Sequence, residues 1–210
     1  MKPHTPIPLV LCEGKEDLLV MEALARQAGI GGKLKFEDYG GESNLRMYLI
    51  NLKARPEFNR GEFSRILVTR DADANHADAW AAVKGAILSA FSCEPSTPGA
   101  WMPTGEGPEI AAWIIPGNDR PGMIETLCLE SARANVPDVF ACLDSFVNCL
   151  TGIHGETPHE KARFAIWTIA AQGPGAKDRM SLQYAIPNLP IDWDDQAFVP
   201  LRELLVEIGS

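Results

Sequence analysis

Positive charge is scarce in this sequence. Its 210 residues include 19 Lys and Arg against 28 Asp and Glu, which gives a formal net charge of -9. An acidic chain does not attract polyanions through its overall field, so a general electrostatic affinity for nucleic acid or for an anionic membrane surface is excluded. Any polyanionic substrate must therefore be held by local basic groups, by a metal ion or by a partner protein.

Cysteine is also scarce, and long hydrophobic runs are missing. The five cysteines are odd in number, show no C-x-x-C spacing and mostly lie in apolar runs, as reduced core thiols do, so a structural zinc is not expected. No run reaches the roughly 18 apolar residues of a membrane span. The N-terminal stretch MKPHTPIPLV is too short and too rich in proline for a signal peptide. We therefore expect a cytoplasmic protein with no membrane partner.

What the sequence does contain is an alternation of strand-like and helix-like segments. Strands that alternate with helices at this spacing predict a parallel sheet with helices on both faces. The continuous apolar run of the third strand is typical of a central position, whereas the second strand alternates polar and apolar residues and is expected to be less buried. The expected strands are 7–14, 33–41, 64–75 and 110–118, and the expected helices are 15–29, 42–54, 76–91 and 120–132.

From about residue 136 the pattern becomes helical throughout. Residues 137–150, PDVFACLDSFVNCL, are apolar on most sides, which predicts a well-buried helix. In the next helix, Thr157 is expected as N-cap, Pro158 at the first helical position and Glu160 as the partner in a capping box. We predict an α/β domain over residues 1–135 and a helical extension over residues 136–210 that packs on it.

Acidic side chains follow several of the predicted strands. Glu13 follows the first, Asp71 and Asp73 follow the third, and Glu125 lies just beyond the fourth. In such sheets ligands bind at the carboxyl ends of the strands, so we expect these acids to converge at one edge. Two carboxylates about 4 Å apart repel by roughly 4 kcal/mol at an effective dielectric near 20. A divalent cation would offset this repulsion, and oxygen ligands favour Mg, with Mn also suitable.

Four short motifs in this chain resemble the TOPRIM domain. That domain is shared by topoisomerases, DnaG-type primases, RecR-like proteins and the overcoming-lysogenization-defect nucleases. The resemblance covers roughly residues 7–135 and is greatest to the nuclease-like branch and to a small, uncharacterised family of stand-alone TOPRIM-related proteins. It implies a Rossmann-like parallel sheet of about four strands and Mg-dependent phosphoryl transfer, with nuclease activity as the main expectation. The motifs are EGKED at 13–17, DYGGESNL at 38–45, RDAD at 70–73 and GMIE at 122–125.

The resemblance also implies roles for single acids. Glu13 resembles a metal ligand or general acid/base, and Asp71 and Asp73 resemble the metal-binding pair. Asp17 and Glu125 resemble the extra ligands that the nuclease branch uses for a second metal. Two cations about 3.5 to 4 Å apart neutralise the attacking and leaving oxygens of a phosphoryl group.

A basic group and two kinds of partner complete this expectation. Lys161 or Lys177 resembles the lysine that stabilises the transition state from the helical tail of the nucleases. Nucleic acid is the expected partner, bound weakly unless metal is present, and the need for an ATPase partner stays open. The oligomeric state is not indicated by the sequence.

Simpler interpretations compete at several positions. Asp17 can complement a helix dipole, Asp73 can be the N-cap of the following helix, and Glu125 can be a solvated glutamate. Lys161 can be an ordinary surface lysine. For GGES at 40–43, Ser43 as an N-cap is preferred to a phosphate-binding turn, and His76 is expected to be exposed and not a ligand.

Two other functions stay open. A D-x-D phosphatase would use Asp71 as nucleophile, although that motif normally lies near the N-terminus and here it lies at mid-chain. A TOPRIM-fold module could instead bind metal or nucleotide without catalysis and regulate a partner, which the acidic composition favours. The discriminating feature is whether Glu13, Asp71, Asp73 and Glu125 point into one cleft.

Overall fold

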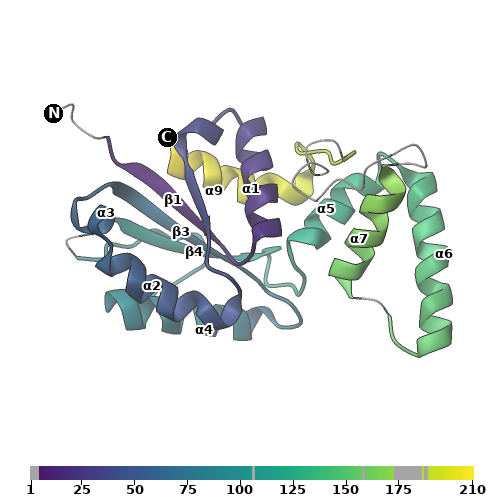
Figure 1. The fold of residues 1–210 in the computed structure, drawn as a ribbon, viewed down its shortest axis with the longest axis horizontal. Helices are drawn as coiled ribbons and strands as arrows, with labels where there is room; N and C mark the ends of the chain where they lie inside the picture. Colours follow the sequence, from purple (N-terminus) through teal and green to yellow (C-terminus); the bar gives the residue numbers. More distant parts are fainter. Residues whose placement is uncertain (1–4, 106, 158, 173–185, 187–188) are drawn as a thin grey trace.

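The computed structural model describes residues 5–210 except 106, 158, 173–185 and 187–188, and its centre is a four-stranded parallel sheet (Figure 1). The strand order is β2-β1-β3-β4, so β3 is central and β2 lies at an edge, as their apolar patterns predict. The predicted fold class, a Rossmann-like parallel sheet flanked by helices, is confirmed. The strands are β1 (Ile7–Cys12), β2 (Lys35–Asp38), β3 (Phe63–Asp71) and β4 (Glu109–Ile115).

Helices cover both faces of the sheet (Figure 1). One face is covered by α2 (Leu45–Ala54), α3 (Pro56–Asn59) and α4 (His76–Phe91). The other is covered by α1 (Lys15–Gln27), α5 (Ile124–Arg133) and α9 (Val199–Gly209). Short 3-10 turns occur at η1 (Gly31–Lys33), η2 (Glu42–Asn44) and η4 (Gln196–Phe198).

Alternation along β3 decides which side chains meet at its carboxyl end. Leu67 belongs to the core beneath α1, α5 and α9, whereas Val68 belongs to the core beneath α2 and α4. Successive residues of a strand point to opposite faces. Asp71 therefore lies on the α1/α5 face of the sheet, and Arg70 lies on the α2/α4 face.

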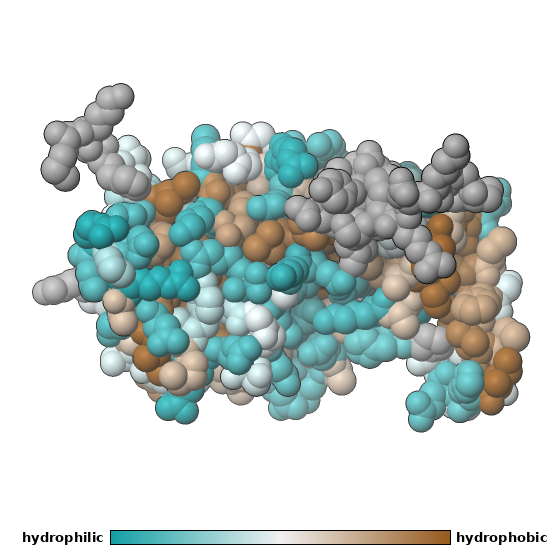
Figure 2. Space-filling model, viewed as in Figure 1, coloured by the Kyte–Doolittle hydropathy of each residue, from teal (hydrophilic) through white to brown (hydrophobic). Residues whose placement is uncertain are grey.

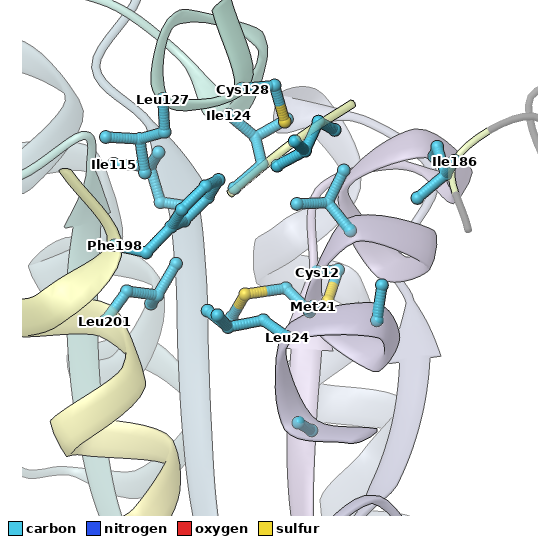
Figure 3. Close-up of a cluster of buried hydrophobic side chains, with 14 of the residues drawn as sticks. Cys12, Met21, Leu24, Ile115, Ile124, Leu127, Cys128, Ile186, Phe198 and Leu201 are labelled. Carbon is cyan, nitrogen blue, oxygen red and sulfur yellow. The ribbon is translucent and has the colours of Figure 1, made fainter. Parts of the chain in front are cut away.

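The core on the α1/α5 face joins distant parts of the sequence (Figure 3). Cys12 of β1 and Met21 of α1 lie in one buried cluster with Ile124 of α5. Phe198 and Leu201, from the last part of the chain, complete this cluster. The end of the chain thus returns to the sheet, and α9 is part of the layer that covers it.

The helices α6 (Pro137–His154) and α7 (Glu160–Ala171) project beyond the end of the sheet (Figure 1). The expectation that residues 137–150 are well buried is wrong. Phe140 and Val147 are buried, but Phe146 is 48% exposed, and Cys142 and Cys149 are exposed as well. Among the described residues α6 packs mainly against α7, and the side that carries Phe146 is open to solvent. Figure 2 shows apolar residues gathered at this end of the molecule.

Two predicted helix caps differ from the structure. The helix α7 begins at Glu160 with His159 as N-cap, so Thr157 does not cap it, and Pro158 lies outside the described residues. Ser43 lies inside the 3-10 turn η2, which leads directly into α2, and no side chain caps that helix. Before α2, the 3-10 turn moved the start of the helix beyond the polar residue that the sequence suggested. Among the described residues, no helix combines the length and apolarity that crossing a membrane requires.

The two phenylalanines of α6 give a test of this description. Phe140 is 1% exposed, and its ring centroid lies 6.1 Å from that of Trp167. Phe140→Ala is expected to lower the free energy of unfolding by about 3 to 5 kcal/mol, because it leaves a cavity in the α6/α7 contact. Phe146→Ala should cost less than about 1 kcal/mol, since that side chain is half in solvent. Urea unfolding of both variants would measure the difference, and equal losses would contradict the placement of α6.

Candidate metal centre

Three acids from separate elements meet at the carboxyl end of the sheet. Asp17 comes from the first turn of α1, Asp71 from the end of β3 and Glu125 from the first turn of α5. One carboxylate oxygen of each lies within 4.8 Å of those of the other two. All three side chains are buried, and none is more than 5% exposed. We call these three residues the acidic triad.

Backbone hydrogen bonds hold two members of the triad in place. Asp71 Oδ1 accepts a hydrogen bond of 3.0 Å from the Ile124 amide at the start of α5. Asp17 Oδ2 accepts one of 2.6 Å from the Gly14 amide at the start of α1. Asp17 therefore does have the simpler role of an acid at a helix start. This hydrogen bond uses only Oδ2, so Oδ1 of Asp17 is not involved in it.

Other oxygens of the triad lack partners. Asp71 Oδ2 and both carboxylate oxygens of Glu125 are buried and accept no hydrogen bond from the described residues. Buried polar atoms are nearly always satisfied by protein, water or an ion. A cation bound between these carboxylates would satisfy them, so the residues present fit a divalent metal ion.

Burial and mutual repulsion shift the acid equilibria of the triad. Desolvation, followed by the charge of neighbouring Asp17, raises the pKa of Glu125 to about 7. Desolvation, with the charge of Glu13, raises the pKa of Asp17 to about 6 against the opposing hydrogen bond from Gly14. The pKa of Asp71 is raised too, by desolvation and by both other triad acids. Without a cation the triad is therefore not fully ionised near neutral pH.

Glu13 and Asp73 lie beside the triad rather than within it. Glu13 Oε2 accepts a hydrogen bond of 3.4 Å from the Asp71 amide. Burial raises the pKa of Glu13, and the charge of Asp73 raises it further. Asp73 is exposed and has a left-handed backbone with φ 49°. It is not the N-cap of α4, because Asn75 has that role and its Oδ1 accepts hydrogen bonds from the amides of Ala77 and Asp78.

Lys161 of α7 supplies positive charge to this end of the sheet. Partial burial lowers its pKa, but the carboxylates of Glu125, Asp71, Asp17 and Glu13 outweigh this, so the pKa is raised. In the described part of the chain Lys161 forms no direct ion pair with them. The Lys161 side chain is exposed, so its charge acts on the acids across this end of the sheet and not as a buried partner of their oxygens. Lys177, the other predicted lysine, lies outside the described residues.

A family model for proteins of unknown function, DUF3226, matches residues 7–208. The chain belongs to the DUF3226 family. The match spans the sheet, the α6/α7 pair and α9, so the triad, Glu13, Asp73 and Lys161 all lie inside the family region. No curated protein and no solved structure matches the sequence. The DUF3226 match assigns no activity, and the TOPRIM resemblance stays a prediction.

Near the carboxyl end of the sheet, two arginines already have carboxylate partners. Arg70 Nη2 lies 2.5 Å from Glu42 Oε2. Arg120 forms a bidentate pair with Glu130, at 2.6 and 2.8 Å. Glu42 was not predicted from the sequence as a functional residue, although it lies in the DYGGESNL motif, and its significance comes only from its contact with Arg70.

A hollow of about 420 Å³ opens next to Asp73 in the DUF3226 structure. Its lining includes Asn75, His76 and the ring of Trp80. The His76 side chain is largely buried, and its Nδ1 lies 3.5 Å from Asp119 Oδ1, so the expectation of an exposed histidine is wrong. His76 is not among the triad, and none of the triad acids lines this hollow.

Proposed function

We propose that this chain is a Mg- or Mn-dependent phosphoryl-transfer enzyme of the TOPRIM type that cleaves nucleic acid. The observation that carries the proposal is the buried acidic triad, whose carboxylate oxygens lack partners, with Lys161 beside it. A protein gains no stability from burying three acids together without compensation. A cation-dependent reaction explains why they are kept at the ligand-binding edge of the sheet.

The residues fall into two groups that suit two metal ions. The triad of Asp17, Asp71 and Glu125 would hold one ion, and Glu13 with Asp73 would complete the more open side of the site. When bound, divalent metal supplies charge neutralisation at the phosphoryl oxygens and a more acidic bound water.

Two side chains of the chain have roles of their own in this scheme. Lys161 would stabilise the negative charge that develops on the transferred phosphoryl group, because its ammonium is held near the acids by α7. Glu13 would accept or donate a proton, since it lies beside Asp71 and burial raises its pKa above the ordinary value of a glutamate.

A nucleic acid substrate accounts for the surroundings of the site. The chain carries a net charge of -9, so metal in the cleft would supply the attraction that the surface lacks. The hollow beside Asp73 presents Trp80, and an aromatic ring can stack with a nucleobase.

Of the two alternative functions, the D-x-D phosphatase fits the geometry less well, and the non-catalytic module claims metal binding without a reaction. A D-x-D phosphatase needs its first aspartate exposed as a nucleophile, whereas Asp71 is buried and bonded to the start of α5. A non-catalytic metal-binding module is favoured by one observation: Arg70 and Arg120 at the rim are both already paired with glutamates. Such a module would bind metal and show no turnover.

Cleavage of labelled DNA and RNA with Mg and with Mn is the direct test. Glu13→Gln should abolish metal-dependent cleavage, and Glu16→Gln, which removes an exposed acid from the same region, should leave it unchanged. Metal binding without cleavage of any substrate would select the regulatory module.

Lys161→Met tests the contribution of α7. It is expected to lower the cleavage rate by roughly 10² to 10³, the loss that follows removal of one charge-stabilising group in a protected site. Lys33→Met is the matched control, because Lys33 is an exposed lysine that precedes β2 and so lies at the amino end of the sheet, away from the acids. If the Lys161→Met variant cleaves at the wild-type rate, Lys161 is an ordinary surface lysine with no role in the reaction.

A further inference from the structure

Arg70 is a buried arginine at the mouth of the site. Its side chain is only 11% exposed, while its partner Glu42 is 61% exposed. Arg70 Nε is buried and donates no hydrogen bond to any described residue. Most of the donors of the guanidinium group are therefore unused by Glu42, which contacts Nη2.

The sheet register places Arg70 next to Glu13. β1 and β3 run parallel with Leu11 opposite Val68, and both of these residues face α2 and α4. Glu13 and Arg70 each lie two residues beyond this pair, and the Asp71 amide donates a 3.4 Å hydrogen bond to Glu13 Oε2, so the Glu13 carboxylate lies at the end of β3 that carries Arg70. The guanidinium charge also lowers the pKa of Glu13, against the effect of burial. Arg70 is thus part of the rim on the side where Glu13 and Asp73 are accessible.

The loop that carries Glu42 is fixed to the site itself. The Gly41 amide donates a 2.8 Å hydrogen bond to the Glu13 carbonyl, and the Tyr39 hydroxyl donates one of 2.9 Å to the Thr69 carbonyl. Gly41 has φ 102°, a conformation that a side chain would disfavour. Glu42 is consequently held opposite Arg70 by the backbone.

We propose that Arg70 is a phosphate-binding group of this site and that Glu42 is its internal competitor. The inference rests on the proposed function and adds a substrate contact to it. A guanidinium group binds a phosphate through two parallel hydrogen bonds, which Lys cannot reproduce. An incoming phosphodiester takes the place of the Glu42 carboxylate, which is solvated enough to be released at small cost.

This exchange suits an acidic protein that must release its product. A free guanidinium beside the metal ligands would bind any phosphate, whereas one paired with Glu42 binds only a substrate that metal also holds. The ligand class is a nucleic acid phosphate adjacent to the one that is cleaved. The Glu42 carboxylate then returns to Arg70 when the product leaves.

Binding of a short labelled single-stranded oligonucleotide in Ca, followed by fluorescence anisotropy, tests the proposal. Arg70→Gln is expected to weaken binding about tenfold and to lower the slope of log affinity against log salt by about 1. Arg70→Lys keeps the charge and should bind with intermediate affinity, which separates loss of the guanidinium from loss of folding. Glu42→Gln should tighten binding roughly three- to tenfold, and only when Arg70 is present.

The control repeats the change at a second ion pair. Arg60 and Glu62, 2.6 Å apart, lie just before β3 at the opposite edge of the sheet, so Glu62→Gln should leave binding unchanged. Equal tightening by Glu62→Gln, or tightening by Glu42→Gln in the Arg70→Gln background, overturns the proposal because it would report overall charge alone.

Thermal shift with Mn on the same variants separates this inference from the metal centre. If Mn stabilises every variant but none binds the oligonucleotide, the Arg70 assignment is wrong and the metal centre stands. If Mn stabilises none of them while Glu42→Gln still tightens binding, the metal centre is wrong and the Arg70 site stands.

Discussion

In chelator, the melting temperature of the protein is expected to fall as the pH rises from 5 to 8, and Mn should reverse that fall. The pKa of Glu125 is raised to about 7 and that of Asp17 to about 6, both by burial in the first place. The folded protein therefore holds protons that the unfolded chain releases near pH 4. The contribution of these two acids to stability is fully present below that pH and is lost as the pH rises through 6 and 7.

The size of this effect follows from the shift of one residue. A unit of pKa corresponds to about 1.4 kcal/mol, so Glu125 alone destabilises the metal-free protein at pH 8 by up to about 3 kcal/mol. At 100-fold excess over its dissociation constant, a metal ion adds about 2.7 kcal/mol. For a chain of this length, 1 kcal/mol changes the melting temperature by roughly 2 to 4 °C. The Mn effect should shrink at pH 5, where the ligands hold protons.

Melts at several pH values, in chelator and in millimolar Mn, measure both effects. Glu125→Gln is the internal control, because it removes the carboxyl group whose pKa is raised to about 7 and should flatten the pH dependence in chelator. A melting temperature that does not change with pH in chelator, and that Mn leaves unchanged at pH 8, would contradict the metal centre.

The sheet and its ligand edge were predictable because the strands carry strong local signals. The apolar run before Asp71 indicated a central parallel strand, and β3 is central. Because successive residues of a strand point to opposite faces, the sequence also predicts that Arg70 and Asp71 lie on opposite sides of the sheet. The sequence therefore indicated which elements bring acids to this edge.

Which acids form the buried triad could not be read from spacing alone. Asp71 and Asp73 look equivalent in the D-x-D pattern, yet Asp71 is buried and Asp73 is exposed. The difference arises because the chain leaves β3 after Asp71 and turns through a left-handed residue at Asp73, whose carbonyl accepts a hydrogen bond from the Gly122 amide. That contact is between distant parts of the chain, so no local pattern encodes it.

The helices after residue 136 show the same limit. An apolar helix is buried only on the sides where other elements lie, and periodicity does not reveal how many such elements there are. The helix α6 has α7 on one side, so Phe146 is half-exposed. The last helix, α9, instead returns to the sheet, and Leu201 packs in the core there (Figure 3).

Asp71→Asn should have opposite effects on stability and on function. In chelator at pH 8 it is expected to raise the free energy of unfolding by about 1 to 3 kcal/mol, because it removes one of three mutually repelling carboxylates. The amide oxygen can still accept the hydrogen bond from Ile124. The new amide hydrogens can donate to Glu125, whose oxygens have no partner among the described residues. The response to Mn and any cleavage activity should be lost.

Two comparisons make this result specific. Asp138→Asn, which removes an exposed acid in the first turn of α6, should change neither the stability in chelator nor the response to Mn. Asp71→Ala relieves the same charge but lacks the oxygen that holds Ile124, so it should be about 1 to 3 kcal/mol less stable than Asp71→Asn, and this difference measures the helix contact alone. If Asp71→Asn is destabilised in chelator and still responds to Mn, then Asp71 is a structural residue that fixes the start of α5, and the cation site must lie elsewhere.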